Sequence, residues 1–512
     1  MHDLTDRLAA SYDALPYRSA AFMQTAPEHL AALAHLFGLS APPPAGARVL
    51  ELGCAAGGNL IPFAARHPQA SALGVELSSA QVDAGRRAIA AMGLRNVTLM
   101  QADLAALPAG LGQFDYVICH GVYSWVPEPV RAAIPRLLAR HLAADGVALV
   151  SYNTYPGWKA KQILRDAMLL GARDAGDGHE RLAAARATTG FLRELAGDGT
   201  LLAKILRDQM QAIDAADDHF LAHDWLELCN APCYFLDFLA AMDAHGLAFL
   251  AEAEPAGSAP TRYGPAVADS LLAQAGGEPR LAEQWLDFLV NRSFRQTLLV
   301  HAERAAAIRP RIEAERLQAL HLAGQFTPAG ALATGAVTHR WHTASGTLLD
   351  AHERCAPALL ERLSAAWPGT VPVPALLAAA DHASAREQAH ALLLRLVAEG
   401  HVRARLTALG TPPGDPQRPA LPAPIRALAA LLAREPLPIA LFNAWHETVD
   451  RLDADMLALL PRLDGSHDLD ALAAALPAHA ADNEATRAAR LQQALRGLRE
   501  RAMFVAPLEN TD

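Results

Sequence analysis

The chain has 512 residues, of which 52% are hydrophobic and 19% are charged, and its formal net charge is −10. This length exceeds what a single hydrophobic core supports, so we expect a globular protein of several domains. The acidic balance argues against broad binding to nucleic acids or to anionic membranes.

The five cysteines form no CxxC pair and no zinc spacing. Reduced thiols in the cytoplasm are the simplest interpretation, and we expect no metal site. The N-terminus lacks the basic and apolar segments of a secretory signal. No apolar run approaches the length of about 18 residues that spans a membrane, so we expect no membrane insertion.

Residues 1–40 are predicted to be helical. The stretch that begins at Thr25 has a capping residue, a proline in the first turn and an acidic residue near the start, which is typical of a helix N-terminus. Tyr12 and Tyr17 precede it, and we expect this N-terminal region to fold over a ligand pocket as a lid. A proline-rich break follows at 41–46.

Strands and helices alternate from residue 48 to residue 155. The predicted strands are 48–52, 72–77, 97–101, 114–119 and 146–152, and the predicted helices lie near 58–66, 79–92 and 128–141. Such alternation implies a parallel, doubly wound sheet. The ligand of such a sheet lies at the carboxyl ends of its strands. We therefore assign 41–160 to a Rossmann-like core.

Residues 161–234 form a predicted block of amphipathic helices. From 235 the pattern changes to helix, glycine stop and strand. A helix near 279–291 and a strand from Ser293 to His301 follow. Two interpretations stay open, in which 235–305 either completes the sheet, with 161–234 as a capping insertion, or belongs to a separate α+β domain.

Two short motifs recur in the C-terminal half, 306–512. They are Trp341-His342 with Leu349-Asp350-Ala351, and Trp445-His446 with Leu452-Asp453-Ala454. We predict two winged-helix-like modules, 306–410 and 425–512, joined by a proline-rich linker at 411–424. Chance similarity between Ala/Leu-rich helices is the alternative. The half carries a net charge of −2, which suits protein docking better than DNA binding.

The stretch that organises the chain is a glycine-rich turn after the first predicted strand. Its pattern, E-x-G-x-x-x-G, is the form found in class I methyltransferases and differs from the GxGxxG of dinucleotide enzymes. Gly53 and Gly57 leave room for a ligand beside the backbone, although Ala55 replaces a glycine usually found between them. The predicted cofactor contacts from this turn are Glu51, Gly53, Cys54, Gly57 and Asn59.

Two acidic residues end the next two predicted strands. A carboxylate at Glu76 can accept both ribose hydroxyls and disfavours a 2′-phosphate, and Asp103 is placed to accept from an adenine amino group. Together with the glycine turn they favour S-adenosylmethionine over a nicotinamide cofactor. The further predicted contacts of this cofactor are Leu77, Leu104 and His120.

Aromatic residues follow the fourth and fifth predicted strands, where the acceptor of a methyl group would lie. Tyr123 and Trp125 can favour a cationic group through their π faces, and Tyr152 and Asn153 are predicted to orient the acceptor. These four are our candidate catalytic residues, with sheet-edge packing as the alternative. The remaining predicted pocket residues are Tyr12, Tyr17, Tyr155 and Trp158. The stretch from His223 can close over the site, but its periodicity suits core packing better.

Four stretches carry a resemblance to a known family. They are VLELGCAAGGNL, SYNTYPGW, HDWLELCNAPCYFLDF and SFRQTLLVH. Together they resemble methyltransferases that bear a methyltransferase regulatory domain, a group that includes the rickettsial-type protein lysine methyltransferases. The resemblance implies a Rossmann-like seven-stranded sheet ending in an antiparallel strand, an adjoining helical regulatory region and a C-terminal domain used for protein substrates.

We therefore predict an S-adenosylmethionine-dependent N-methyltransferase that acts on lysine side chains of a protein. A small-molecule methyltransferase is the alternative enzyme. A non-catalytic S-adenosylmethionine-binding or DNA-binding regulator is the alternative from another class. We expect no nucleic-acid partner.

Overall fold

The computed structural model describes most of the chain. The described residues are 2–195, 221–258, 263–330, 339–378, 383–410, 415–479, 483–504 and 506–507, with Gly199, Ala203, Lys204, Arg207, Gln209, Ile213 and Asp218. Residues 411–414 of the predicted linker and most of 196–220 in the predicted insertion lie outside this set.

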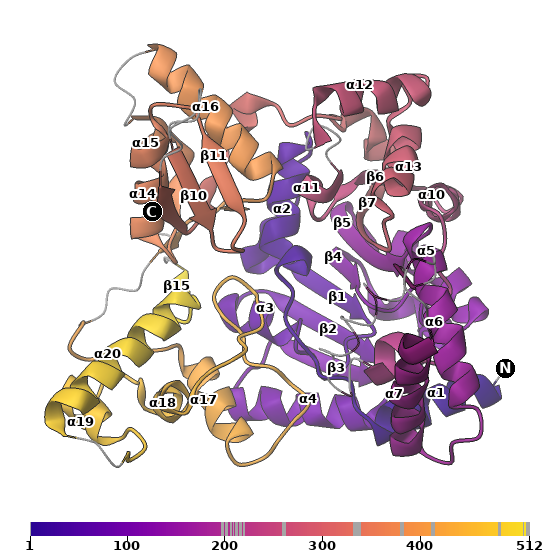
Figure 1. The fold of residues 1–512 in the computed structure, drawn as a ribbon, viewed down its shortest axis with the longest axis horizontal. Coiled ribbons are helices and arrows are strands. Elements are labelled where there is room, and N and C mark those ends of the chain that lie inside the picture. The colour runs from indigo at the N-terminus through magenta and orange to yellow at the C-terminus, as the bar shows by residue number, and fades with distance from the viewer. Residues whose placement is uncertain are drawn as a thin grey trace.

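A seven-stranded sheet forms the centre of the molecule (Figure 1). Its order is β3-β2-β1-β4-β5-β7-β6, and only β7 runs antiparallel to its neighbours. The strands are β1 Arg48–Leu52, β2 Ser71–Glu76, β3 Val97–Gln101, β4 Phe114–Cys119, β5 Leu142–Asn153, β6 Leu247–Glu252 and β7 Phe294–His301. The predicted Rossmann-like sheet with an antiparallel last strand is confirmed, and the region from 235 onward completes it.

Helices connect and flank the strands of the central sheet. The helices that flank the sheet are α3 Ile61–Arg66, α4 Ser79–Met92, α5 Glu128–His141, α10 Phe235–Asp243, α11 Pro255–Ser258, α12 Pro265–Gln274 and α13 Pro279–Val290. The Ser78 hydroxyl accepts from the Gln81 amide at the start of α4, and Gly93 ends that helix with φ 69°. Burial on both sides explains why β1 is apolar apart from Glu51 and the exposed Arg48.

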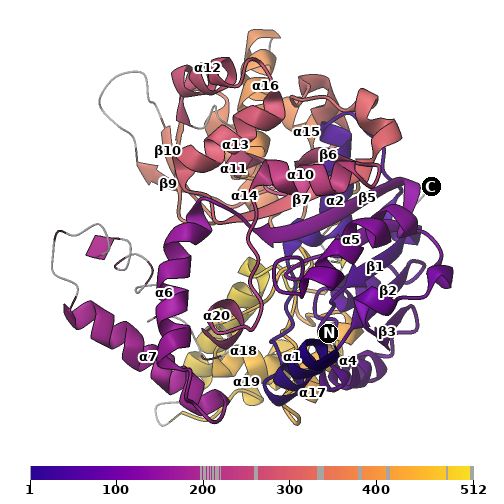
Figure 2. The same ribbon diagram turned by 90° about the vertical axis from the view of Figure 1, so that its right-hand side faces the viewer.

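The N-terminal region and the helical block contribute further helical elements. They comprise α1 His2–Ala14, α2 Pro27–Leu36, α6 Gly157–Gly171, α7 Gly178–Leu195 and the π-helical turn η5 Leu221–Trp225. Figure 2 shows α6 and α7 extending away from the sheet as a pair. Buried Leu164, Met168 and Leu182 give this pair a small core of its own with Trp225.

The C-terminal half consists of short strands and helices. Its strands are β8 His321–Ala323, β9 Phe326–Gly330, β10 His339–Thr343, β11 Leu348–Ala351, β12 Val371–Pro372, β13 Arg403–Arg405, β14 Leu409–Gly410 and β15 Ala506–Pro507. Its helices are α14 Ala356–Ala366, α15 Val373–Ala378, α16 Ala383–Ala398, α17 Ala423–Leu432, α18 Ala454–Leu459, α19 Leu469–Ala474 and α20 Glu484–Glu500. Two three-stranded sheets, β12-β8-β13 and β11-β10-β9, lie in its first part.

The internal repeat predicted from two matching motifs is wrong. Leu349-Asp350-Ala351 lies in β11, whereas Asp453 caps the start of α18 with its carboxylate. Trp341 lies in β10, whereas Trp445 lies in a loop and stacks on Trp367, with ring centroids 6.3 Å apart. The matching residues therefore lie in different secondary structures. This agrees with the alternative interpretation, in which the two motifs match by chance in Ala/Leu-rich sequence.

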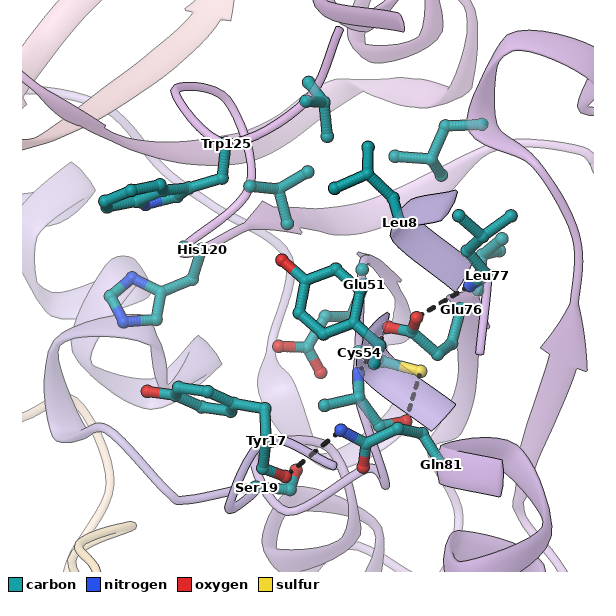
Figure 3. Close-up of a pocket in the computed structure, with 18 of the residues that line it drawn as sticks. Leu8, Tyr17, Ser19, Glu51, Cys54, Glu76, Leu77, Gln81, His120 and Trp125 are labelled. Atoms are coloured by element: carbon teal, nitrogen blue, oxygen red, sulfur yellow. Dashed lines mark hydrogen bonds between the residues drawn. The ribbon is translucent and has the colours of Figure 1, made fainter. Parts of the chain in front are cut away.

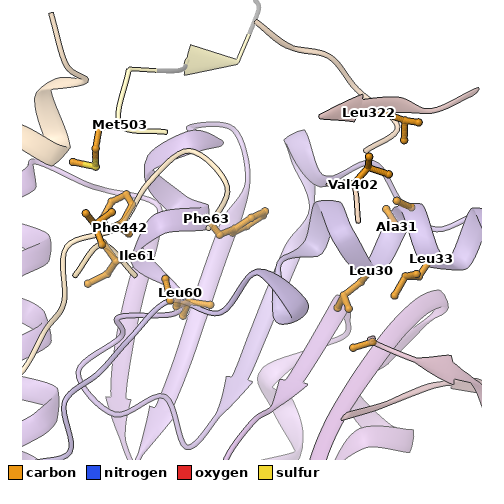
Figure 4. Close-up of a cluster of buried hydrophobic side chains, with 14 of the residues drawn as sticks. Leu30, Ala31, Leu33, Leu60, Ile61, Phe63, Leu322, Val402, Phe442 and Met503 are labelled. Atoms are coloured by element: carbon orange, nitrogen blue, oxygen red, sulfur yellow. The ribbon is translucent and has the colours of Figure 1, made fainter. Parts of the chain in front are cut away.

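One buried apolar cluster joins the C-terminal half to the central sheet. Figure 4 shows Leu30 of α2 and Phe63 of α3 in the same cluster as Leu322, Phe442 and Met503 from the C-terminal half. All five side chains are at most 3% exposed. The two parts of the chain therefore share a hydrophobic core.

Candidate functional site

A cavity of about 210 Å³ lies at the carboxyl ends of β1 to β4 (Figure 3). The strand ends and the loops after them contribute most of its lining, as predicted for a doubly wound sheet. The lining residues from this part are Glu51, Gly53, Cys54, Ala55, Asn59, Val75, Glu76, Leu77, Gln81, Asp103, Leu104, His120, Gly121, Val122, Trp125, Val126, Pro127 and Val130. The remaining lining comes from Thr5, Leu8, Tyr12, Tyr17, Ser19, Ala20, Phe22, His223 and Asp224.

The glycine-rich turn has a backbone that only small residues permit. Gly53 has φ 73° and Gly57 has φ 78°, both in the left-handed region. A Cβ atom on Gly53 would lie 2.4 Å from Val122. Ala55, the departure from the usual glycine, also adopts a left-handed φ of 47°. Its amide donates to the Glu76 carboxylate at 2.9 Å, which ties the turn to the end of β2.

Glu51 presents an unsatisfied carboxylate oxygen at the cavity wall. Its Oε1 accepts a hydrogen bond from the Asn59 amide at 2.8 Å, while its Oε2 is buried without a partner. Burial raises the pKa of Glu51 to about 7, and the neighbouring Glu76 acts in the same direction. A cationic amine in the cavity would satisfy this oxygen and hold the carboxylate ionised.

Glu76 and Asp103 both line the cavity, at the ends of β2 and β3. Glu76 Oε1 accepts from the amides of Leu77 and Ser78, at 2.8 and 2.9 Å. Burial raises the pKa of Glu76, although the backbone donors act in the opposite direction. Asp103 Oδ1 accepts from the Ala105 amide at 2.8 Å. These bonds hold both carboxylates at the cavity wall, where the sequence predicts contacts with the ribose and the adenine of the cofactor.

Helix α1 covers the cavity from the side opposite the sheet. Tyr12 stacks on His223, with ring centroids 5.4 Å apart, and His223 Nε2 donates to the Leu15 carbonyl at 3.0 Å. Asp13 Oδ1 accepts from the Ser78 hydroxyl at 2.5 Å at the start of α4. The predicted lid is therefore tied both to the helical block and to the central sheet.

The predicted acceptor residues divide into two groups. Trp125 lines the cavity, whereas Tyr123, Tyr152 and Asn153 do not. The Tyr152 ring stacks on Phe238 at 3.9 Å, and its hydroxyl lies 3.2 Å from Thr297 Oγ1 in the buried core.

Tyr123 packs edge-on against the same Phe238 ring at 5.4 Å. Asn153 donates to Asn230 at 2.9 Å. The prediction that Tyr123, Tyr152 and Asn153 contact the acceptor directly is therefore corrected, because their side chains are engaged in the protein interior.

Two of the predicted pocket residues also lie behind the cavity wall. Tyr155 and Trp158 are absent from the lining, whereas Tyr12 and Tyr17 belong to it. The Trp158 ring lies 5.9 Å from the Trp125 ring and supports it from outside the cavity. Gly57 shapes the turn through its backbone but is also absent from the lining.

His120 and Asp224 both line the cavity and carry titratable side chains. The His120 ring packs on Phe22 at 4.5 Å, and its Nδ1 is buried without a partner. Burial lowers the pKa of His120 to about 4. Burial raises the pKa of Asp224 to about 6, against the opposing charges of His223 and Lys161.

The periodicity of the stretch from His223 favours core packing over closure of the site, but the structure brings His223 and Asp224 to the cavity. Ser19, Phe22 and Gln81 are further lining residues that the sequence gave no signal to find. All three reach the cavity through tertiary packing.

Two family descriptions match the chain. Residues 49–146 match a methyltransferase domain, and residues 217–301 match a predicted methyltransferase regulatory domain. Protein RP028 of Rickettsia prowazekii is 35% identical over 230 residues, which is 45% of this chain and 92% of that protein. The chain belongs to the class I methyltransferases that carry a methyltransferase regulatory domain.

Two further relatives extend the comparison. Protein RP789 of Rickettsia prowazekii is 39% identical over 57% of this chain, and the match spans 52% of that protein, about half its length. The structure of PKMT2 from Rickettsia typhi in complex with AdoHcy has a TM-score of 0.82 and 24% identity. It covers 95% of this chain and 99% of that one, so the whole architecture is shared, the C-terminal half included.

The cofactor of this family is S-adenosylmethionine, and the cavity residues fit it. The unpartnered Glu51 oxygen suits the amine of the methionine part. The left-handed Gly53 leaves space at the backbone, and Glu76 and Asp103 supply hydrogen-bond acceptors farther along the wall. No group of three or more His, Cys, Asp or Glu side chains that could hold a metal occurs among the described residues. No helix in the described part of the chain is long and apolar enough to cross a membrane.

Proposed function

We propose that this protein is an S-adenosylmethionine-dependent N-methyltransferase that acts on lysine side chains of a protein substrate. The observation that carries the proposal is that Trp125 and Asp224 both line the cofactor cavity. An aromatic face and a carboxylate together suit an amine that arrives as a cation. The shared architecture with PKMT2 from Rickettsia typhi supports a protein as the acceptor.

Methyl transfer from a sulfonium is an in-line displacement in which the acceptor nitrogen bonds to the methyl carbon as the carbon–sulfur bond breaks. The lysine amine must be neutral before this attack, so a proton must leave it. Asp224, with its pKa raised to about 6, lines the cavity and is our candidate for the group that takes this proton. Desolvation of the amine beside Trp125 lowers the pKa of the amine and assists the transfer.

The lid residues complete the site by excluding water. Tyr12 and Tyr17 lie over the cavity from the N-terminal segment, and Tyr17 is 37% exposed. Entry of an extended side chain beside Tyr17 would leave the cofactor covered by α1. The proposal places the reaction in the cytoplasm, in keeping with five cysteines that are all free thiols.

The test follows tritium from labelled S-adenosylmethionine into a whole-cell protein extract, with acid hydrolysis and separation of the methylated lysines. We expect label in methyl-lysine and a loss of about 100-fold in rate for Asp224→Asn, as for removal of a general base. The matched control is Asp218→Asn, because Asp218 is an exposed aspartate of the same helical block and pairs with Arg186 at 2.8 Å.

Label confined to low-mass material would exclude the lysine acceptor and favour a small-molecule substrate. An unchanged rate for Asp224→Asn would exclude Asp224 as the base.

A further inference from the structure

The C-terminal half contributes a side chain to the cofactor-binding turn. His446 lies in the loop between Asn443 and Glu447 and is 1% exposed. Its Nε2 lies 3.0 Å from Asn59 Oδ1, across 387 positions of sequence. Asn59 itself lines the cavity, so the bond reaches the cofactor site from outside the Rossmann-like core.

The protonation of His446 follows from its two neighbours. Arg66 approaches His446 Nδ1 at 2.8 Å, and a guanidinium only donates hydrogen bonds, so Nδ1 must be the acceptor. The ring proton therefore lies on Nε2, which donates to Asn59 Oδ1. The His446 ring thus connects the Arg66 guanidinium of α3 to the side-chain amide of Asn59 in the cofactor-binding turn.

Asn59 transmits this bond to the cavity. Its Oδ1 also accepts from the Thr25 hydroxyl at 2.8 Å and from the Phe22 amide at 3.2 Å. With its oxygen committed to these donors, its NH₂ group is directed to Glu51 Oε1 at 2.8 Å. The second oxygen of Glu51 is the unpartnered one at the cavity wall. The orientation of that carboxylate therefore depends on the donors that fix Asn59.

The loop that presents His446 is held rigidly. His446 has a left-handed φ of 60°, which is uncommon for a residue with a Cβ and persists only where the surroundings impose it. Asn443 Oδ1 accepts from the amides of Trp445 and Glu447, at 2.9 and 3.0 Å. The Trp445 indole donates to the Pro368 carbonyl at 3.0 Å. These bonds fix the loop that presents the imidazole.

A second connection runs alongside the first. The segment around Ser19 pairs with Ile439 as a parallel bridge, and the Ala440 amide donates to the Ser19 carbonyl at 2.9 Å. The Ser19 hydroxyl accepts from the Gly58 amide at 2.7 Å. The C-terminal half therefore also supports the N-terminal segment that lines the cavity beside Glu51 (Figure 3).

We propose that His446 is a positioning residue for S-adenosylmethionine, which acts through Asn59 to hold the Glu51 carboxylate toward the amine of the cofactor. The C-terminal half is then part of the cofactor site as well as a candidate docking surface. The inference requires that the cavity binds S-adenosylmethionine, the cofactor of the family. It does not depend on whether the methyl acceptor is a lysine side chain.

The test is isothermal titration of the full-length protein with S-adenosylmethionine, together with its melting temperature. His446→Leu removes both hydrogen bonds of the ring, and we expect binding roughly tenfold weaker, as for loss of a buried hydrogen bond. His446→Gln keeps a donor and an acceptor, and we expect a Kd within about threefold of the wild type. The matched control is Asp450→Asn, because Asp450 joins the same two parts through an exposed pair with Arg18.

A double-mutant cycle separates positioning from folding. If His446 acts through Asn59, His446→Leu adds no further loss of affinity in the Asn59→Ala background. Independent, additive losses would overturn the proposal. So would a His446→Leu protein with a lowered melting temperature and wild-type affinity, because that result describes a structural residue only.

Discussion

The stability of the protein in mild acid depends on the same buried imidazole. His446 lies against Arg66, Glu28 and His67, and its burial, reinforced by Arg66, lowers its pKa from 6.5 to about 3. Below pH 6.5 the unfolded chain takes up a proton on this residue that the folded chain does not. Stability is therefore complete above about pH 6.5 and falls as the pH drops toward 3.

The size of the effect follows from the size of the pKa shift. At about pH 5, some 1.5 units below the ordinary pKa, the folded state loses about 2 kcal/mol, at about 1.4 kcal/mol per unit. The His446→Gln variant keeps the polar contacts and does not titrate. The measurement is urea unfolding of both proteins at about pH 7.5 and pH 5.

We expect the wild type to lose about 2 kcal/mol more than His446→Gln between these two values of pH. Other groups, His120 among them, titrate in both proteins and cancel in the difference. Equal losses in the two proteins would show that His446 is not held neutral, which would refute the hydrogen-bonding scheme inferred for it.

Two further predictions concern the cavity and its surroundings. Ala55→Gly relieves a left-handed φ of 47°. Urea unfolding should show the free energy of unfolding raised by about 0.5–1 kcal/mol, because the relieved strain of about 1–2 kcal/mol exceeds the entropic cost of glycine. A lower free energy of unfolding would mean that the turn tolerates alanine without strain. Tyr152→Phe removes only a hydroxyl that faces Thr297 in the core, so the rate of methyl transfer should stay at the wild-type value. Trp125→Ala changes the cavity wall and should lower this rate more than tenfold. A large loss of rate in Tyr152→Phe would restore Tyr152 to the acceptor site.

The strands were predictable because a buried sheet leaves a local signature. Strand β3 and strand β4 have the predicted bounds, and β1 does so as well, since each is a short apolar run between turns. Strand β5 begins at Leu142, four residues earlier than predicted. The residues added at its start, 142–145, include the exposed Asp145 and are not continuous with the buried run from 146, and Leu142 pairs with Phe114 of β4.

Side-chain direction was harder to predict than strand position. Tyr123 lies in the loop after β4 and Tyr152 lies near the end of β5, and the sequence alone does not fix which face a residue at a strand end takes. The structure turns both rings toward Phe238 of α10, a helix more than 80 positions farther along the chain. Trp125, two residues after Tyr123, faces the cavity.

Long-range hydrogen bonds overrode one local prediction. Thr25 was expected to cap helix α2, but the N-cap residue is Ala26, which has no side-chain hydrogen bond to the helix. The Thr25 hydroxyl instead donates to Asn59 Oδ1 at 2.8 Å in the buried network. A capping pattern describes what a residue can do locally, and a buried partner competes with it.

The same network argues against treating the C-terminal half as a detachable docking module. Glu28 of α2 is 6% exposed and pairs at 3.1 Å with both Arg66 of the core and Arg405 of the C-terminal half. These cations hold the pKa of Glu28 well below its usual range despite its burial. Removal of the C-terminal half would take away one of the two guanidinium partners and expose the apolar cluster around Leu30 and Phe63. Loss of activity in a truncated chain would therefore report on the cofactor core as much as on a docking surface, and single substitutions such as His446→Gln are the changes that separate the two.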